Sequence, residues 1–507
     1  MPKRKQPCKL QALVMLRVVK LLRKACESWI TALREAALTG SEAYLKETQN
    51  VTADCDTVYE LLTSLPTDIL QLLATHIIRR IINMIAQYDE TCCELKDAFW
   101  YDEDYHDSVC SKILNAVLFP CTRVYYMKDI TSGFAQKLIV QTLACVPNLT
   151  VLTFDLKTEN DNSNLVASNI HHLRHLKSFQ YNCDCTDEVV EQVALHCRNL
   201  RTVILSFSHS VTDASVHYLM TLNKLEHVDV MFTSITTEFY GALLSVLPSI
   251  NNIVITSLTY NIFEHILKEE LYTITQYTGY IRDINVLTQK CPNLSTVVMY
   301  DINQNLANMV ALNRLDHLQI RKADYESCNL NAVLIGVGHR LCHLYLVHIK
   351  NVRMVEIVNF CSSLECLLLK RCSFVRLNEN GILGTDPPHY RSVTDLKLLG
   401  DSHHEIDFRH LQHYVNLQIL ECTGVNTLND DFIEDAVRQG AFRNIVCFKV
   451  EEIAPGALTM RTVELLIRHC EHLKELGYLR SWRLVEPEFI SNLRNIIVTT
   501  NSDLHIL

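Results

Sequence analysis

The most regular feature of the sequence is a short apolar phrase. An anchor residue is followed by two variable positions, an apolar residue, one variable position and another apolar residue, as in Leu149-x-x-Leu152-x-Phe154. The alternation of apolar and other residues over these positions predicts a short β-strand with one buried face. The anchors are Leu149, Leu176, Leu200, Leu225, Ile250, Leu294, Leu315, Leu341, Leu364, Val393, Leu417, Ile445 and Leu473, with a weaker copy at Leu493.

Successive anchors lie mostly 20 to 29 residues apart, so the phrase marks an internal repeat. One interval is longer, because Ile250 and Leu294 are separated by 294 − 250 = 44 residues, close to two periods. A degenerate copy at Leu271-x-x-Ile274 or a helical insertion fills residues 256–290, and the sequence leaves both open. A leading copy at Cys121-x-x-Val124-x-Tyr126 opens the array.

Between the anchors, the apolar spacing lengthens to that of an amphipathic helix. In residues 186–197 the apolar side chains fall at positions 189, 190, 193, 194 and 197, which form one helical stripe. Thr186 stands where a helix cap belongs, and Asp187 follows in the first turn. The same start recurs at Thr212-Asp213 and at Thr236-Thr237-Glu238.

Each repeat therefore predicts a strand, a loop, a helix and a loop within about 25 residues. Such a unit cannot bury its apolar faces alone, so neighbouring units must stack. We predict an α/β solenoid over residues 118–507. It is expected to be a horseshoe with parallel strands on the inside and helices on the outside.

These repeats resemble a known family. Leu364-x-x-Leu367-x-Leu369-x-x-Cys372 fits the consensus of leucine-rich repeats. A cysteine three residues before the anchor, as in Cys291-Pro292-Asn293-Leu294, is similar to the cysteine-containing subclass, which is typical of F-box proteins with leucine-rich repeats. In that family the F-box helices bind a Skp-type adaptor of a cullin-RING ubiquitin ligase, and the repeats hold the substrate.

The chain ahead of the repeats is predicted to be all-helical. We expect a basic helical arm over residues 1–57 and a helical region over residues 58–117, either F-box-like or capping. The stretch Leu65-Pro66-Thr67-Asp68-Ile69-Leu70-Gln71-Leu72-Leu73 resembles the opening of an F-box. The later V-C-[KR]-x-W element of that family has no full match, so a helical cap that shields the first repeat is the alternative. The adaptor-binding residues implied by the resemblance are Leu65, Pro66, Ile69, Leu70 and Leu73.

Composition excludes several functional classes. Lys and Arg total 47 against 57 Asp and Glu, a balance of 47 − 57 = −10, so nucleic-acid binding is not expected. The eight basic residues within positions 1–24 are not balanced by any acid, which marks the arm as locally basic. No Gly-rich phosphate loop, GxSxG or HExxH motif occurs. We therefore expect no catalytic residue, no cofactor and no enzymatic activity.

The 20 cysteines are scattered from Cys8 to Cys470 without a CxxC pair. A chain of 507 residues with 48% hydrophobic content needs no disulfide framework, so mostly buried, unpaired thiols in a reduced compartment are expected. No metal site is expected, because the repeat places its cysteines a whole period apart. No run of 18 uncharged apolar residues suggests a membrane span, and the expected location is the cytoplasm, the nucleus or both.

Side chains beside the anchors are expected to face the concave side of the sheet, because strand residues alternate between its two faces. In the middle repeats these positions carry Tyr and Arg, which are enriched at binding hot spots, together with flanking charge. The predicted partner-binding residues are Asp229, Tyr300, Arg321, Tyr345, Lys370 and Lys397.

Two functions are compatible with these features. The first is a protein-interaction module that recruits a substrate to an SCF-type ubiquitin ligase, with a Skp-type adaptor and a cullin as further partners. The alternative is a leucine-rich-repeat scaffold or regulator without a ligase, whose N-terminal helices only cap the solenoid.

Overall fold

The computed structural model describes residues 10–94, 103–126, 130, 132–155, 163–256, 261–375, 392–400, 414–425, 428–452, 458–482, 485–499 and 503–507. The chain divides into two compact units, residues 8–267 and residues 268–507. This division falls inside the repeat array, whereas the sequence placed boundaries after residues 57 and 117. The first nine residues of the expected basic arm lie outside the described residues.

Four long helices open the first unit: α1 (Leu10–Thr39), α2 (Ser41–Thr63), α3 (Thr67–Glu94) and α4 (Glu103–Asn115). α1 packs against α2 and α3, and α2 packs against α4. α3 also contacts α5 (Gly133–Gln141), the first helix of the repeats. Between these helices, the buried ring of His106 lies 5.0 Å from Tyr88 and 5.2 Å from Phe134 of α5, measured between centroids. The helical region and the first repeat therefore share one core.

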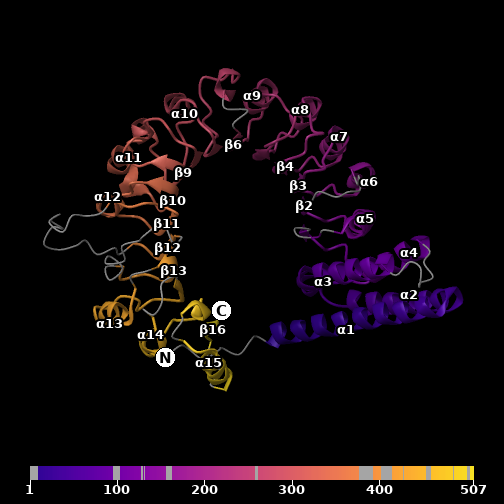
Figure 1. The fold of residues 1–507 in the computed structure, drawn as a ribbon. Coiled ribbons are helices and arrows are strands. Elements are labelled where there is room, and N and C mark those ends of the chain that lie inside the picture. The colour runs from indigo at the N-terminus through magenta and orange to yellow at the C-terminus, as the bar shows by residue number, and fades with distance from the viewer. Residues whose placement is uncertain are drawn as a thin grey trace. The chain divides into compact units, whose positions relative to one another are not determined.

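The repeats of the first unit form a parallel sheet with helices along one side (Figure 1). Its five strands are hydrogen-bonded in chain order: β1 (Val124–Tyr126), β2 (Val151–Asp155), β3 (Ser178–Asn182), β4 (Thr202–Ile204) and β5 (His227–Asp229). The later helices are α6 (Ser163–Asn169), α7 (Asp187–His196), α8 (Ala214–Leu219) and α9 (Thr237–Val246).

An asparagine marks the end of this five-stranded sheet. β6 (Asn252–Ile255) follows β5, and the buried side-chain amide of Asn252 bonds to the backbone of Val228. Its oxygen accepts from the Val228 N–H and its nitrogen donates to the Val228 carbonyl, both at 2.9 Å. The Asn252 side chain thus makes the two hydrogen bonds to Val228 that the backbone of a neighbouring strand would otherwise make.

The second unit repeats the same plan. Its strands lie side by side in chain order: β7 (Gln276–Gly279), β8 (Thr296–Tyr300), β9 (His317–Asp324), β10 (His343–Lys350), β11 (Cys366–Lys370), β12 (Asp395–Leu399), β13 (Ile419–Val425), β14 (Cys447–Glu452), β15 (Glu475–Gly477) and β16 (His505–Ile506). Its helices are α10 (Ile284–Lys290), α11 (Leu330–Val337), α12 (Met354–Phe360), α13 (Asp430–Arg438), α14 (Met460–His469) and α15 (Pro487–Thr499).

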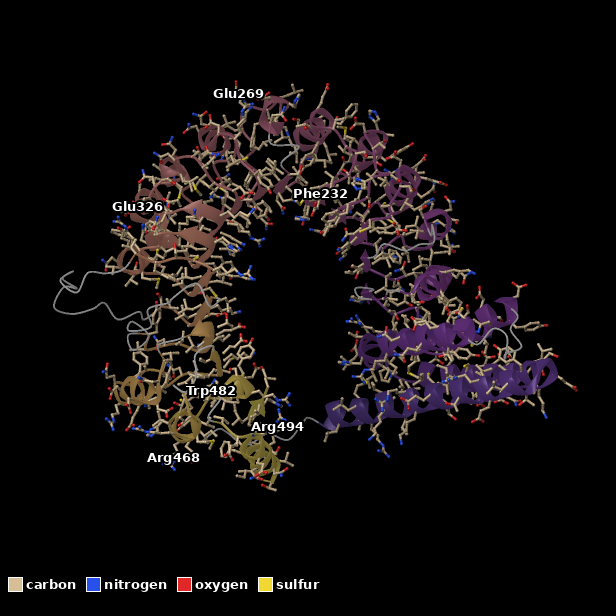
Figure 2. The ribbon with its side chains drawn as sticks, viewed as in Figure 1. Phe232, Glu269, Glu326, Arg468, Trp482 and Arg494 are labelled. Atoms are coloured by element: carbon tan, nitrogen blue, oxygen red, sulfur yellow. The ribbon has the colours of Figure 1, made fainter. Side chains whose placement is uncertain are left out.

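Short 3₁₀ helices stand in for the α-helix of some repeats or extend it. They are η1 (Leu143–Cys145), η2 (Ile170–His172), η3 (Ile262–Glu264), η4 (Ala307–Ala311), η5 (Gly338–Arg340) and η7 (Leu479–Ser481). Beyond η7, the fully buried indole of Trp482 donates from Nε1 to the Val450 carbonyl at 2.7 Å and packs beside β14 (Figure 2).

The anchors form the core of each unit. Leu200 and Leu225 in the first unit and Leu341, Leu364 and Leu417 in the second are all at most 2% exposed. Every paired strand is parallel to its neighbour, and helices cover the face that the anchors occupy. The predicted fold class, an α/β leucine-rich-repeat solenoid preceded by a helical region, is confirmed.

Three details of the repeat pattern differ from the sequence prediction. The leading copy is shifted by one residue, because Tyr125 rather than Val124 pairs with Leu152 and is buried, so this copy begins at Thr122 and not at Cys121. Residues 256–290 hold a degenerate repeat, since β7 follows Ile274 and pairs with β8, but its anchor is Ile274 rather than Leu271. Leu271 occupies the place that Cys291 takes in the next repeat. The weaker copy at Leu493 is wrong, because Leu493 lies in α15 and the last strand is instead β16.

The repeat cysteines are packing residues. Cys197, Cys291, Cys361 and Cys470 are buried, free thiols at the ends of helices. The Cys197 Sγ donates to the Leu173 carbonyl of the preceding repeat at 3.3 Å. Burial raises the pKa of each of these four thiols to about 12, so they stay protonated near neutral pH.

Candidate partner-binding surface

The outward face of the second sheet carries rows of side chains that run across its strands. In β8 the exposure alternates, with Thr296, Val298 and Tyr300 partly exposed between buried neighbours. Since the strands pair in register, each of these positions continues into the next strands. One such row is Val298, Gln319, Tyr345, Leu368, Lys397, Glu421 and Lys449.

Tyr300 and Arg321 stand next to each other in this register. The Arg321 guanidinium lies 5.3 Å from the centroid of the Tyr300 ring, within the range of a cation–π interaction. With the Gln319 amide oxygen turned toward it, the guanidinium also donates to that oxygen from Nε at 2.7 Å and from Nη2 at 2.9 Å. Tyr280 also contacts Tyr300 edge-on, at 5.5 Å between ring centroids. Arg321 is therefore held in place while remaining exposed.

A second aromatic group surrounds Tyr345. The rings of His317 and His343 stack at 5.1 Å, and Tyr345 meets His317 edge-on at 4.9 Å. Burial, followed by the neighbouring His343, lowers the pKa of His317, so this ring is neutral near pH 7. Burial also raises the pKa of Tyr345, whose side chain hydrogen-bonds to Cys366. His317 and Tyr345 therefore present neutral, amphipathic rings.

Charged side chains continue the surface toward the C-terminus. Lys370 is exposed, and Lys397 lies 4.0 Å from a carboxylate oxygen of Asp395. Farther along, the Lys449 Nζ lies 2.7 Å from Oε2 of Glu475. This hydrogen bond lowers the pKa of Glu475 and raises that of Lys449. The surface thus passes from aromatic groups to partly paired charges.

The predicted residues do not all belong to one unit. Tyr300, Arg321, Tyr345, Lys370 and Lys397 come from neighbouring strands of the second sheet. Asp229 belongs to the first unit, where its Oδ1 accepts from the Met231 N–H at 2.9 Å and fixes the turn after β5. That these residues bind a partner stays a prediction.

The sequence reading missed an exposed aromatic pair in the first unit. Phe207 and Phe232 stack at 4.9 Å between centroids and are 50% and 37% exposed. Both have positive φ values, 65° and 55°, which bulky side chains rarely adopt. Each stands two residues after the last apolar position of its phrase, so an alignment on the anchors would have revealed them. Figure 2 shows Phe232 on the strand side of its repeat.

The F-box-like residues are divided between surface and core. Leu70 and Leu73 are buried, Leu65 and Ile69 are partly exposed, and Pro66 is exposed. Leu73, which is completely buried, sits in the part of α3 that packs within the helical region. The motif therefore offers only part of its apolar side chains to another molecule.

One described helix is long and apolar enough to cross a membrane by length and composition alone. It is the segment Thr67–Cys93 of α3, and half of its most apolar window is buried inside the structure. The sequence analysis predicts no membrane span, because no run of 18 apolar residues is free of charge, and this helix contains Arg79 and Arg80. In this structure α3 packs as a core helix against α1, α4 and α5.

No protein-family model matches the sequence, and no curated protein matches it. Several solved structures do. Rad7, from the complex of Rad7 and Elc1 in yeast, is 11% identical, with 90% of this chain and 96% of that chain covered and a TM-score of 0.42. A leucine-rich-repeat protein of Leptospira interrogans is 13% identical, with 76% and 100% covered and a TM-score of 0.37. An internalin of Listeria monocytogenes is 11% identical, with 67% and 82% covered and a TM-score of 0.36.

Proposed function

We propose that this chain is a protein-interaction module that holds its partner on the outward face of the second sheet. The observation that carries this proposal is the aromatic and cationic surface built by Tyr300, Arg321 and Tyr345 on three adjacent strands. Their positions are fixed by the sheet, so little side-chain freedom is lost when a partner binds. Tyr and Arg in such a setting are the residue types that dominate protein interfaces.

We further propose that the partner is a substrate delivered to an SCF-type ubiquitin ligase, with a Skp-type adaptor docking at the start of α3. Exposed Pro66 and partly exposed Leu65 support this role, together with Leu61 and Leu72, which are 67% and 41% exposed. The free thiols among the described cysteines fit a reduced compartment, so we propose the cytoplasm or the nucleus as its location.

A scaffold without a ligase is the second candidate. It is favoured by the burial of Leu70 and Leu73 and by the packing of α3 on α5, because a helix that caps the repeats would be buried in this way. The two candidates share the partner surface on the second sheet and differ only in what the N-terminal helices do.

Affinity purification from cells of the source organism, followed by mass spectrometry, separates the candidates. The ligase proposal expects an adaptor and a cullin with the parent chain and their loss from the double variant Leu65→Ala and Pro66→Ala. Leu38→Ala is the control, because Leu38 is 60% exposed on α1, away from the motif. A parent chain that brings down neither an adaptor nor a cullin contradicts the ligase role.

A further inference from the structure

A polar groove of about 700 Å³ lies in the first unit, along the edge of the sheet where the strands begin. The start of α3 forms one wall, and residues flanking the anchors of successive repeats form the rest. It is lined by Thr67, Asp68, Gln71, Cys121, Arg123, Asn148, Thr150, His175, Lys177, Asn199, Arg201 and Lys224.

The fold arranges the floor of this groove as a regular row. Arg123, Thr150, Lys177 and Arg201 occupy the same position in four successive repeats. The backbone N–H groups of Thr150, Lys177 and Arg201 each donate to the carbonyl of the preceding member of the row at 2.8 Å. Adjacent strands are about 4.8 Å apart, so the four side chains stand side by side at that spacing. The row is therefore a fixed ladder of groups on a rigid sheet edge.

The groove as a whole is strongly cationic. The groove contains four permanent cations, Arg123, Lys177, Arg201 and Lys224, against the single carboxylate of Asp68. Arg201 pairs with Glu226, and the Lys224 Nζ donates to the Asn199 side chain at 2.7 Å. Within the part of the chain that the structure describes, the exposed Arg123 and Lys177 side chains have no ion-pair partner.

Repeat architecture alone does not require this charge. In the second unit, the equivalent positions carry one base and two acids. They are Thr275, Ser295, Asp316, Cys342, Glu365, Thr394, Gln418, Val446 and Lys474. The backbone bonding there is the same, as in the Thr394 N–H that donates to the Glu365 carbonyl at 2.9 Å. The cations are thus a property of the first repeats, in a chain whose formal charge is −10.

We propose that this groove binds an acidic peptide segment of a protein partner in an extended conformation. An extended peptide presents alternate side chains to one face about 6.6 Å apart, a spacing that flexible Arg and Lys side chains can follow along the ladder. The side-chain amides of Asn148, Asn199 and Gln71 supply polar groups for its backbone. A nucleic acid fits less well, because it needs a broad basic surface and this chain is acidic overall.

The test uses the full chain and a fluorescein-labelled peptide of about eight glutamates, measured by fluorescence anisotropy at about 50 mM and 200 mM salt. The variant is Arg123→Gln with Lys177→Gln. The control is Lys46→Gln with Arg80→Gln, which removes the same charge from exposed sites outside the groove. Thermal melting of both variants checks that they remain folded.

We expect salt-sensitive binding by the parent, a loss of roughly tenfold or more in the groove variant and less than about a twofold change in the control. No binding by the parent overturns the proposal, as does an equal loss in both variants. Tighter binding of a single-stranded oligothymidylate of equal charge also overturns it, since the ligand would then be a nucleic acid. This site is independent of the partner surface on the second sheet, so either can fail without the other.

Discussion

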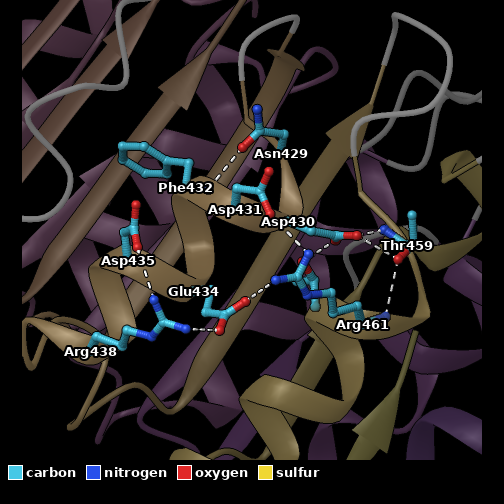
Figure 3. Close-up of polar contacts among 10 residues, drawn as sticks. Asn429, Asp430, Asp431, Phe432, Glu434, Asp435, Arg438, Thr459 and Arg461 are labelled. Atoms are coloured by element: carbon cyan, nitrogen blue, oxygen red, sulfur yellow. Dashed lines mark hydrogen bonds and ion pairs between the residues drawn. The ribbon is translucent and has the colours of Figure 1, made fainter.

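The carboxylate of Asp430 holds Thr459 of the next repeat by two hydrogen bonds, accepting from its backbone N–H at 2.9 Å and from its hydroxyl at 2.5 Å (Figure 3). In the first unit, Asp187 accepts from the N–H and hydroxyl of Thr212 at 2.8 and 2.7 Å. The acid at the start of one helix therefore joins its repeat to the following one, beyond any effect on its own helix.

This link predicts a specific loss of stability. Asp430→Asn keeps the size of the side chain but removes its charge and one acceptor, leaving Thr459 donors poorly satisfied. We expect a loss of about 1–3 kcal/mol in the free energy of unfolding, measured by urea denaturation. Asp431→Asn is the control, because Asp431 is exposed and pairs with Arg461 at the surface, so its loss should stay below about 1 kcal/mol. Equal effects of the two changes would contradict the link.

Much of the repeat fold could be predicted because its signals are local. An anchor phrase has the period of a strand, and Thr186 and Thr236 do accept the expected cap bonds from the N–H groups of Val189 and Phe239 at 3.4 and 3.5 Å. The prediction at Leu493 failed for the same reason, since Leu493, Ile496 and Val498 of α15 imitate the phrase although Ile496 and Val498 are exposed. The structure buries Leu493 with Ile490 and Ile497, at helical spacing.

The surfaces were harder to predict, because they combine positions from several repeats. The sequence shows Arg321 and Tyr300 as separate residues, whereas their stacking depends on the register of β8 and β9. The cationic groove needs the start of α3 beside the strand edge, which no local pattern specifies. The positive φ values of Phe207 and Phe232 likewise follow from the turn geometry of adjacent repeats.

The repeat cysteines should resist labelling. With the pKa of the buried Cys197 and Cys291 thiols at about 12, only about one thiolate in ten thousand is present at pH 8. Iodoacetamide at pH 8, followed by peptide mass spectrometry, should modify the exposed Cys93 first and these two only after unfolding. Rapid labelling of Cys197 in the folded chain would show that this site opens.

The pair of Lys449 and Glu475 predicts a pH-dependent contribution. Because the pKa of Glu475 is lowered in the folded state, the pair stabilises the fold fully above the usual glutamate pKa of about 4.3. This stabilisation is lost as the pH falls through the pKa of Glu475 in the folded state. Because the pKa of Lys449 is raised, the stabilisation by this pair persists up to about pH 10. A double-mutant cycle with Lys449→Gln and Glu475→Gln should give a coupling of about 0.2–1 kcal/mol at pH 7 that decreases as the pH falls below the usual glutamate pKa of about 4.3.

The partner surface makes a separate prediction. Tyr345→Ala and Arg321→Ala should each weaken binding of the co-purified partner roughly thirtyfold, the effect of losing about 2 kcal/mol at a hot spot. Ile335→Ala is the control, because Ile335 is 58% exposed on α11, on the helical side of the repeat. Isothermal titration calorimetry measures the affinities. If the α11 variant weakens binding and the two sheet variants do not, the partner binds the helical side instead.

The F-box-like motif predicts that stability and adaptor binding respond to different residues. Leu73 is completely buried, so Leu73→Ala should lower the free energy of unfolding by about 2–5 kcal/mol whatever the function. Pro66 is exposed, so Pro66→Ala should change stability by less than about 1 kcal/mol. If the start of α3 docks an adaptor, only the Pro66 variant loses that partner while its thermal melting stays that of the parent. Unchanged adaptor capture by Pro66→Ala combined with Leu65→Ala would leave α3 the role of a cap, because Leu70 and Leu73 of the motif are already buried in the core.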